Sequence, residues 1–264
     1  MKRMVGRNIF ITNLKAVLKD GGQDLFVQRA ADSKFAAIWI RVGRGRTADP
    51  NLSLPGLQTI RQALKSHGVE LWGWHVPFCE DEDAAVTEAK SLVKWSADSH
   101  LDGVILDVER THESPRFRGD VNDAKTYAGL VAKETRARGM GLGFSSHDQP
   151  SLHKDLPFAP FLAEIQDLCP QVYYQSASVD RRFNKSAKDY ANLLGNAADF
   201  PDRFKPTGNI TVNEDLPLPD AKTCVEAAGR FIRLVKEKQL AAYSFWCWDG
   251  APTEIWEFFK DTSA

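Results

Sequence analysis

The sequence has few cysteines, and their arrangement excludes several classes of protein. Its four cysteines, Cys79, Cys169, Cys224 and Cys247, form no CxxC pair and have no histidine at zinc-finger spacing. Cys169 and Cys247 lie in apolar runs typical of buried strands. We therefore expect free thiols in a chain made for a reducing compartment, and neither a disulfide framework nor a zinc finger.

The sequence also lacks a charge excess and a long apolar run. Its 34 Lys and Arg residues against 35 Asp and Glu give a net charge of −1, so nothing attracts it generally to nucleic acid or to an anionic membrane. No run of about 18 apolar residues predicts a membrane span. The first residues, MKRMVGRNIFITNLKAVLKD, lack the apolar core and cleavage site of a secretory signal. We expect a chain that is cytoplasmic as synthesised and reaches the outside, if it does, by lysis or by a route other than general secretion.

What the sequence does contain is a repeated alternation of strand-like and helical segments over its 264 residues. The apolar, strand-like runs are Asn8–Leu14, Phe35–Gly43, Glu70–Phe78, Gly103–Glu109, Met140–His147, Pro170–Gln175, Lys205–Thr211 and Ala241–Asp249. Segments such as Asp83–Ser96 between them repeat apolar residues with a helical period. Eight such units in a chain near the ~250 residues typical of the fold predict an α/β protein, a single (β/α)8 barrel spanning residues 1–264. The rival, an open doubly wound sheet, usually carries a Gly-rich phosphate turn after its first strand, and Gly21–Gly22 do not form one.

A pair of carboxylates ends the fourth run. Side chains alternate along a strand, so Asp107 and Glu109 face the same way as Ile105, towards the barrel axis at its carboxyl end. Cleavage of a glycosidic bond needs a proton donor and a carboxylate that supports positive charge. Two close carboxylates resist simultaneous ionisation, so one of them keeps its proton at neutral pH. Acidic strand ends are common in this fold, however, and a structural pair fits the bare motif equally well.

Aromatic and polar side chains cluster at the ends of other predicted strands. Sugars combine flat apolar faces with dense hydroxyls, which suits such surfaces. A single Trp more often fills the core, but the pattern recurs on several strands. We predict a substrate-binding set formed by Arg41, Trp74, His75, Ser145, His147, Tyr173, Gln175, Trp246, Trp248 and Asp249.

Two other chemistries are weaker interpretations of the same residues. Ser145 lies in GFSSHD, without the GxSxG elbow of a serine hydrolase. A metal-dependent hydrolase would use His75 and His147 with Asp107 and Glu109, but no HxH or HExxH spacing supports it. We therefore expect neither a metal nor a cofactor.

At this point the sequence resembles known families. LDGVILDVE resembles the fourth-strand signature DGxDxDxE of family 18 chitinases, with Asp102, Gly103, Asp107 and Glu109 at matching positions. Ile105 stands where that family has another aspartate. The resemblance implies a barrel that hydrolyses N-acetylhexosamine polymers, with Glu109 as the proton donor.

Two later motifs extend this resemblance. VYYQ resembles the family's MxYD, with Tyr174 at the tyrosine position and Gln175 in place of the aspartate. Trp246 or Trp248 takes the place of the strand-eight tryptophan. The resemblance implies that Asp107 and Tyr174 hold the N-acetyl group of the substrate, which acts as the nucleophile.

Two further resemblances concern other barrels. Family 25 lysozymes share the strand-four DxE, but they carry an aspartate on strand one, where this chain offers Asn13. Bacterial and phage glycoside hydrolase-like barrels show a series similar to SSHDQPSLH, PQVYY, PTG and FWCW in this chain.

We therefore predict a glycoside hydrolase acting on peptidoglycan or a chitin-like polysaccharide. The alternative is a catalytically inactive carbohydrate-binding barrel, because Ile105 and Gln175 replace two charged residues of the chitinase pattern.

Overall fold

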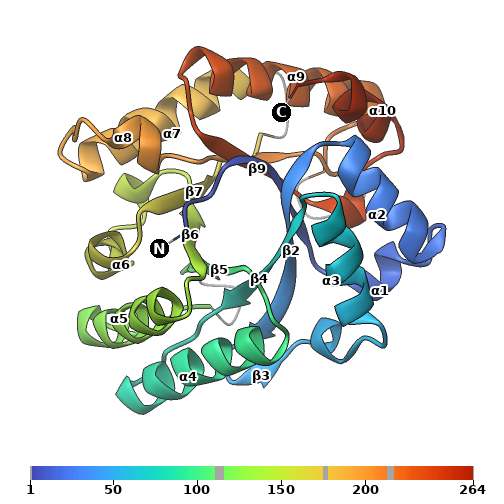
Figure 1. The fold of residues 1–264 in the computed structure, drawn as a ribbon. Helices are drawn as coiled ribbons and strands as arrows, with labels where there is room; N and C mark the ends of the chain where they lie inside the picture. Colours follow the sequence, from blue (N-terminus) through green and yellow to red (C-terminus); the bar gives the residue numbers. More distant parts are fainter. Residues whose placement is uncertain (1, 111–115, 175–177, 213–216, 264) are drawn as a thin grey trace.

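A computed structural model describes residues 2–110, 116–174, 178–212 and 217–263. Its parallel strands form a closed barrel, since β1 pairs with both β2 and β9 (Figure 1). The barrel strands are β1 (Gly6–Ile11), β2 (Phe35–Arg44), β4 (Glu70–Val76), β5 (Gly103–Asp107), β6 (Gly141–His147), β7 (Asp167–Gln171), β8 (Thr207–Asn209) and β9 (Ala242–Trp246). The short β3 (Thr47–Ala48) pairs antiparallel with the end of β2.

Helices surround the barrel and cover its outer face (Figure 1). They are α1 (Leu14–Val17), α2 (Gly22–Asp32), α3 (Leu57–Ser66), α4 (Glu82–Asp98), α5 (Val121–Ala137), α6 (Phe158–Glu164), α7 (Val179–Leu193), α8 (Phe200–Arg203), α9 (Ala221–Glu237) and α10 (Glu254–Asp261), with 3-10 turns η1 (Pro50–Ser53), η2 (Pro150–Leu152) and η3 (Trp248–Gly250). The predicted α/β fold, a (β/α)8 barrel, is confirmed. No helix within the described ranges is long and apolar enough to cross a bilayer.

The sixth barrel strand, β7, differs from its predicted extent. It covers Asp167–Gln171 and ends before the apolar VYY that suggested a longer strand. The backbone N–H groups of Val172 and Tyr173 donate to the carbonyls of Pro170 and Gln171, at 3.0 and 2.8 Å. These tight local bonds turn the chain out of the sheet. Gln171 is therefore the last inward residue of this strand.

Aromatic side chains fill the inside of the barrel. Trp39 and Trp72 lie fully buried there, with ring centroids 6.3 Å apart. The indole of Trp72 occupies the space beside Gly103 and Gly141, where an added Cβ would come within 2.5 and 2.2 Å of the ring. Glycine at the starts of β5 and β6 thus makes room for this tryptophan.

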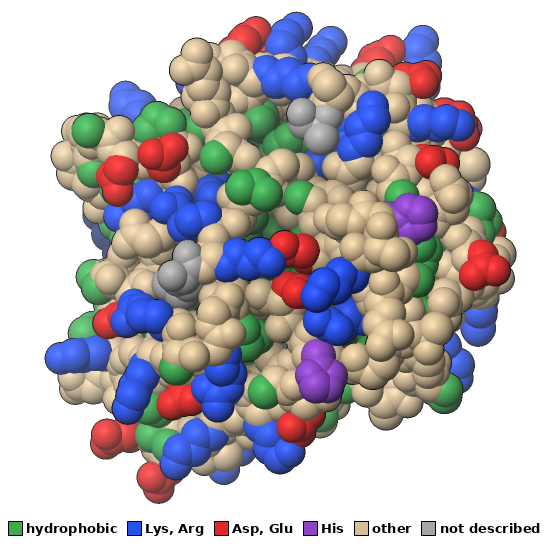
Figure 2. Space-filling model, in the orientation of Figure 1, with side chains coloured by type: hydrophobic (Ala, Val, Ile, Leu, Met, Phe, Trp, Pro, Cys, Tyr) green, Lys and Arg blue, Asp and Glu red, His purple; other side chains and the backbone are tan. Residues whose placement is uncertain are grey.

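The first residues of the chain close the amino end of the barrel. Met4 is buried in the inner cluster, and its backbone N–H donates to Asp167 at 2.6 Å. Asp167 also pairs with Lys205 at 2.9 Å and with Arg3 at 2.7 Å. Figure 2 views the molecule from this end, where acidic and basic side chains lie side by side near the centre. The negative charge of Asp167 is thus balanced by Lys205 and Arg3. This pattern indicates that the amino end of the barrel stabilises the fold.

Candidate active site

Asp107 and Glu109 lie together at the carboxyl end of the barrel, joined by one amide. Gln171 Nε2 donates to Asp107 Oδ1 and to Glu109 Oε1, at 2.8 Å each. Ser145 Oγ donates to the same Asp107 oxygen at 2.8 Å. These contacts follow from strand alternation, because Asp107, Ser145 and Gln171 are inward residues on three adjacent strands.

The two carboxyl groups differ in burial and in charge environment. Asp107 is only 4% exposed, whereas the Glu109 side chain is 13% exposed and lies 3.5 Å from Arg116. Burial raises the pKa of Asp107 to about 7, and the negative charge of Glu109 adds to this effect. Arg116, Ser145 and Gln171 oppose it but do not cancel it. At neutral pH Asp107 is therefore close to half protonated.

An aromatic wall lies beside this pair. The ring centroids of Tyr173 and Trp246 are 6.2 Å apart, and Trp246 meets Trp74 edge-on at 5.7 Å. Trp74 is fixed by a 3.0 Å bond from Nε1 to the Ile11 carbonyl. Burial, with the nearby charges of both carboxylates, raises the pKa of Tyr173 well above its ordinary value, so its hydroxyl stays neutral. Tyr173 and Trp246 are therefore part of the surface beside the acid pair, and Trp74, only 2% exposed, packs against Trp246 in the barrel interior.

Arg41 extends this wall on the neighbouring strand. Its Nε donates to Asp49 at 2.5 Å, and its guanidinium lies 5.5 Å from the ring centroid of Trp74. Asp49 also accepts from the Asn51 backbone at 3.0 Å, which fixes the ion pair in place. A rigid cation thus lies against an aromatic ring on the inner surface.

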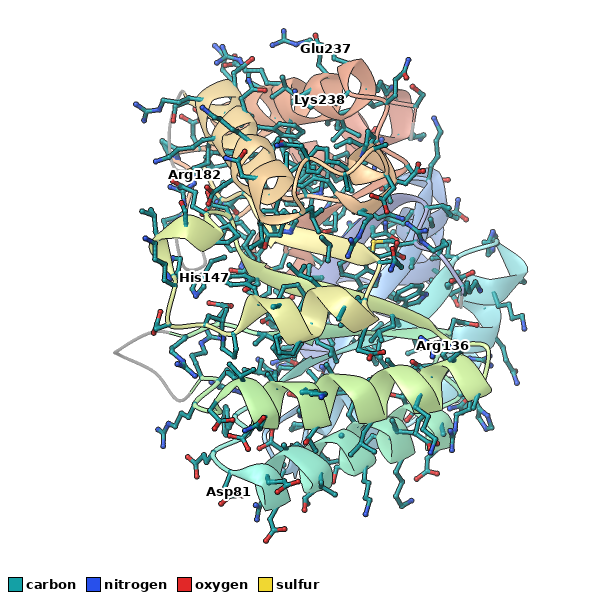
Figure 3. The ribbon with its side chains drawn as sticks, turned by 90° about the vertical axis from the view of Figure 1, so that its left-hand side faces the viewer. Asp81, Arg136, His147, Arg182, Glu237 and Lys238 are labelled. Atoms are coloured by element: carbon teal, nitrogen blue, oxygen red, sulfur yellow. The ribbon has the colours of Figure 1, made fainter. Side chains whose placement is uncertain are left out.

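His147 supports the chain directly after Glu109. Its Nε2 lies 3.2 Å from the backbone nitrogen of Arg110, and its ring stacks on His153 with centroids 3.5 Å apart. Burial lowers the pKa of His147, while the nearby Glu109 carboxylate opposes this shift. The side view places His147 and Arg182 towards one end of the barrel and Arg136 towards the other (Figure 3).

Two predicted residues lie outside this group. His75 faces the helix layer, because alternation along β4 turns Trp74 inward. Its ring nitrogens lie 2.8 Å from the Tyr127 hydroxyl and 2.9 Å from the Gly45 carbonyl, and burial lowers its pKa to about 4. Tyr174 packs on Phe231 in the outer layer, because β7 ends earlier than the sequence suggested.

The chain after β9 also departs from prediction. Trp248 packs against Phe26 and Trp256 in the outer layer, with centroids at 4.8 and 4.5 Å. Asp249 accepts the backbone N–H groups of Thr12 and Asn13, at 2.8 and 2.7 Å, and so ties this segment to the end of β1. Trp248 is thus part of the outer layer, whereas Asp249 lies at the carboxyl end of β1, and its role in substrate binding stays a prediction. Gln175 lies outside the described residues.

Two residues of the site, Gln171 and Arg116, were not predicted from the sequence. The alternation of Asp167, Cys169 and Gln171 in DLCPQ carries the signal for Gln171, but the apolar VYY that follows masked it. Nothing in the sequence marks Arg116, which reaches Glu109 from beyond the strand.

The described residues provide no basis for a metal centre. His75 and His147 face different layers, and no three His, Cys, Asp or Glu side chains in these ranges converge as ligands would. The ligand set that a metal-dependent hydrolase would need from these two histidines does not form.

Comparisons with known proteins agree on the fold. No protein-family model and no curated protein sequence matches the chain. A GH18 chitinase structure from Pseudoalteromonas aurantia is similar over 97% of each chain, with a TM-score of 0.67 and 14% identity. The Bacillus cereus spore cortex-lytic enzyme SleL is similar over the whole chain and 75% of its own length (TM-score 0.65, 9% identity). A mutant of a plant class V chitinase from Cycas revoluta, solved with (GlcNAc)3, covers 98% of this chain and 99% of its own (TM-score 0.69, 10% identity). At these identities the similarity establishes that the chain shares the (β/α)8 fold of these proteins.

Proposed function

We propose that the protein is a glycoside hydrolase that cleaves a polymer of N-acetylhexosamine. The observation that carries the proposal is the pair Asp107 and Glu109, joined through Gln171 at the carboxyl end of the barrel beside the Tyr173–Trp246 surface. Glycosidic cleavage uses two carboxyl groups near one bond, one as acid and one to stabilise positive charge. A sugar ring stacked on the aromatic wall would lie next to both.

The difference in exposure supports the roles that we propose for the two acids. Glu109 is the more exposed carboxyl and is the group that reaches a glycosidic oxygen. Asp107 accepts two hydrogen bonds at Oδ1, so its proton lies on Oδ2. Asp107 is thus partly protonated at neutral pH and can supply its proton to the site. Glu109, once it carries this proton, delivers it to the leaving oxygen.

The structurally similar proteins support the sugar specificity that we propose. One of them is a spore cortex-lytic enzyme, others are chitinases, and one was solved with an N-acetylglucosamine trimer. We carry this substrate class over to the present chain as part of the proposal.

A carbohydrate-binding barrel without catalysis is the second candidate function, and one observation favours it. Glu109 is ion-paired with Arg116, and the proton of the pair resides on buried Asp107. Acid catalysis requires the proton on Glu109 instead. The aromatic wall would bind sugar in either case.

Turnover separates the two candidates. Fluorescently labelled N-acetylglucosamine oligomers and labelled peptidoglycan are incubated with the wild type, Glu109→Gln and a matched control, Glu226→Gln, on the exposed face of α9. A hydrolase predicts turnover that falls by ~10²-fold or more in Glu109→Gln alone. Tight binding of the same oligomers with no turnover by the wild type would establish the binding barrel.

A further inference from the structure

Three arginines lie close together around the acid pair. Arg41 and Arg44 come from the end of β2, and Arg116 lies 3.5 Å from Glu109. Arg44 lies within electrostatic range of both other arginines and of Asp107. Its side chain is exposed, and none of the described residues forms a hydrogen bond or ion pair with it.

The charges of this group do not balance. Asp49 neutralises Arg41, and Glu109 neutralises Arg116. Among the described residues, Asp107 is the acid of this group with no cationic partner at ion-pair distance. It is largely protonated below a pH of about 7 and then offers Arg44 little negative charge. Partial burial lowers the pKa of Arg44, and its two arginine neighbours lower it further; Asp49 and Asp107 oppose this shift but do not cancel it. An anion placed at Arg44 would relieve this repulsion.

We infer that Arg44, with Arg41 and Arg116 beside it, binds a carboxylate carried by the glycan, so that the substrate is an anionic N-acetylhexosamine polymer and not neutral chitin. The inference rests on the proposed glycosidase function and names its substrate class. The chemistry required is a sugar bearing a carboxylate on a short arm, such as the lactyl ether of the muramic acid residue in peptidoglycan.

The arrangement of the arginines fits this ligand. The planar guanidinium group matches a carboxylate with two parallel N–H donors. Arg41 uses only its Nε among its bonds to described residues, so its terminal nitrogens remain for a second contact. The same guanidinium lies on Trp74, and Trp74 contacts Trp246. The cationic group is therefore continuous with the surface proposed for the sugar ring.

A matched ligand series tests the charge alone. The disaccharide of N-acetylglucosamine and N-acetylmuramic acid is compared by calorimetry with its methyl ester, which keeps the size but removes the charge, and with N,N′-diacetylchitobiose. The charged disaccharide should bind more tightly than the ester in the wild type. In Arg44→Gln this preference should fall by about two- to five-fold, the scale of one exposed ion pair, while Arg44→Lys should retain part of it. The preference should also shrink as salt rises from 0.01 to 1 M, across which the Debye length falls from about 30 to 3 Å.

Arg136→Gln is the matched control, since this exposed arginine lies on α5 at the opposite end of the barrel (Figure 3). It should leave the preference unchanged, and melting temperatures verify that each variant folds. Equal dissociation constants for the acid and the ester, or no binding of any of the three, would overturn the inference.

Turnover of the same ligands distinguishes the two proposals. Preference for the charged disaccharide without turnover supports the carboxylate subsite and removes the hydrolase. Turnover with no difference between acid and ester supports the hydrolase and removes the subsite.

Discussion

The buried proton on Asp107 should make the stability of the protein depend on pH in an unusual direction. The pKa of Asp107 rises from 3.8 to about 7 on folding, so between these values the folded state binds one more proton than the unfolded chain. The free energy of unfolding then falls as pH rises through this window, by about 1.4 kcal/mol per unit. The full loss is about 4 kcal/mol on going from pH 4 to above pH 7.

Asp107→Asn removes this titration while keeping the Oδ1 acceptor that Ser145 and Gln171 use. Urea unfolding of both proteins from pH 4 to pH 8 measures the difference. The variant should gain stability relative to the wild type as pH rises, and the exposed control Asp24→Asn on α2 should follow the wild type. Parallel curves for the wild type and Asp107→Asn would refute the buried proton. In Glu109→Gln the difference should shrink, because the charge that raises the pKa of Asp107 is gone.

Three further predictions concern the surrounding residues. Trp246→Ala should weaken oligosaccharide binding by about 1–3 kcal/mol, measured by calorimetry. Trp248→Ala should leave binding unchanged but lower the free energy of unfolding by about 3–5 kcal/mol, measured by urea unfolding. Gln171→Leu removes a hydrogen bond that lowers the pKa of Asp107, so this pKa should rise above about 7. Infrared spectroscopy of the carboxyl stretch as a function of pH measures this change. The pKa of His75 is about 4 instead of 6.5, so the folded state binds fewer protons than the unfolded chain between these values. About 3 kcal/mol of stability is therefore lost on acidification through that window, and His75→Gln should abolish this dependence in urea titrations.

The sequence predicted the barrel because its signal is long-range and redundant. Eight runs with helical segments between them define the fold even though individual ends shift by several residues. The geometry of Asp107 with Ser145 likewise follows from alternation on adjacent strands, which the sequence states directly. Residues predicted to lie together do so where the sequence pattern gives both the end of a strand and its inward face correctly.

The departures have two physical causes, which are the exact residue where a strand stops and the face on which a side chain lies. On β7 an apolar sequence continues after the sheet ends, since local backbone bonds replace the ladder at Val172 and Tyr173. The position beside the acid pair therefore belongs to Gln171 and not to Tyr174. On β4 the choice between Trp74 and His75 is a choice of face, and two adjacent residues cannot both point inward. The resemblance to family 25 lysozymes remains a prediction.

Two buried acids, one on β5 and one on β7, show how differently the ends of the barrel are built. Asp167 at the amino end is 1% exposed and meets Lys205, Arg3 and the Met4 backbone. Asp107, similarly buried at the carboxyl end, meets another carboxylate instead. A buried acid without a cationic partner lowers the free energy of unfolding at neutral pH, and the contacts of Asp167 show that the chain can provide such partners. Conflicts of this kind persist where a site needs a proton or a charge for binding or catalysis, and this supports a functional role for the carboxyl end over a structural one.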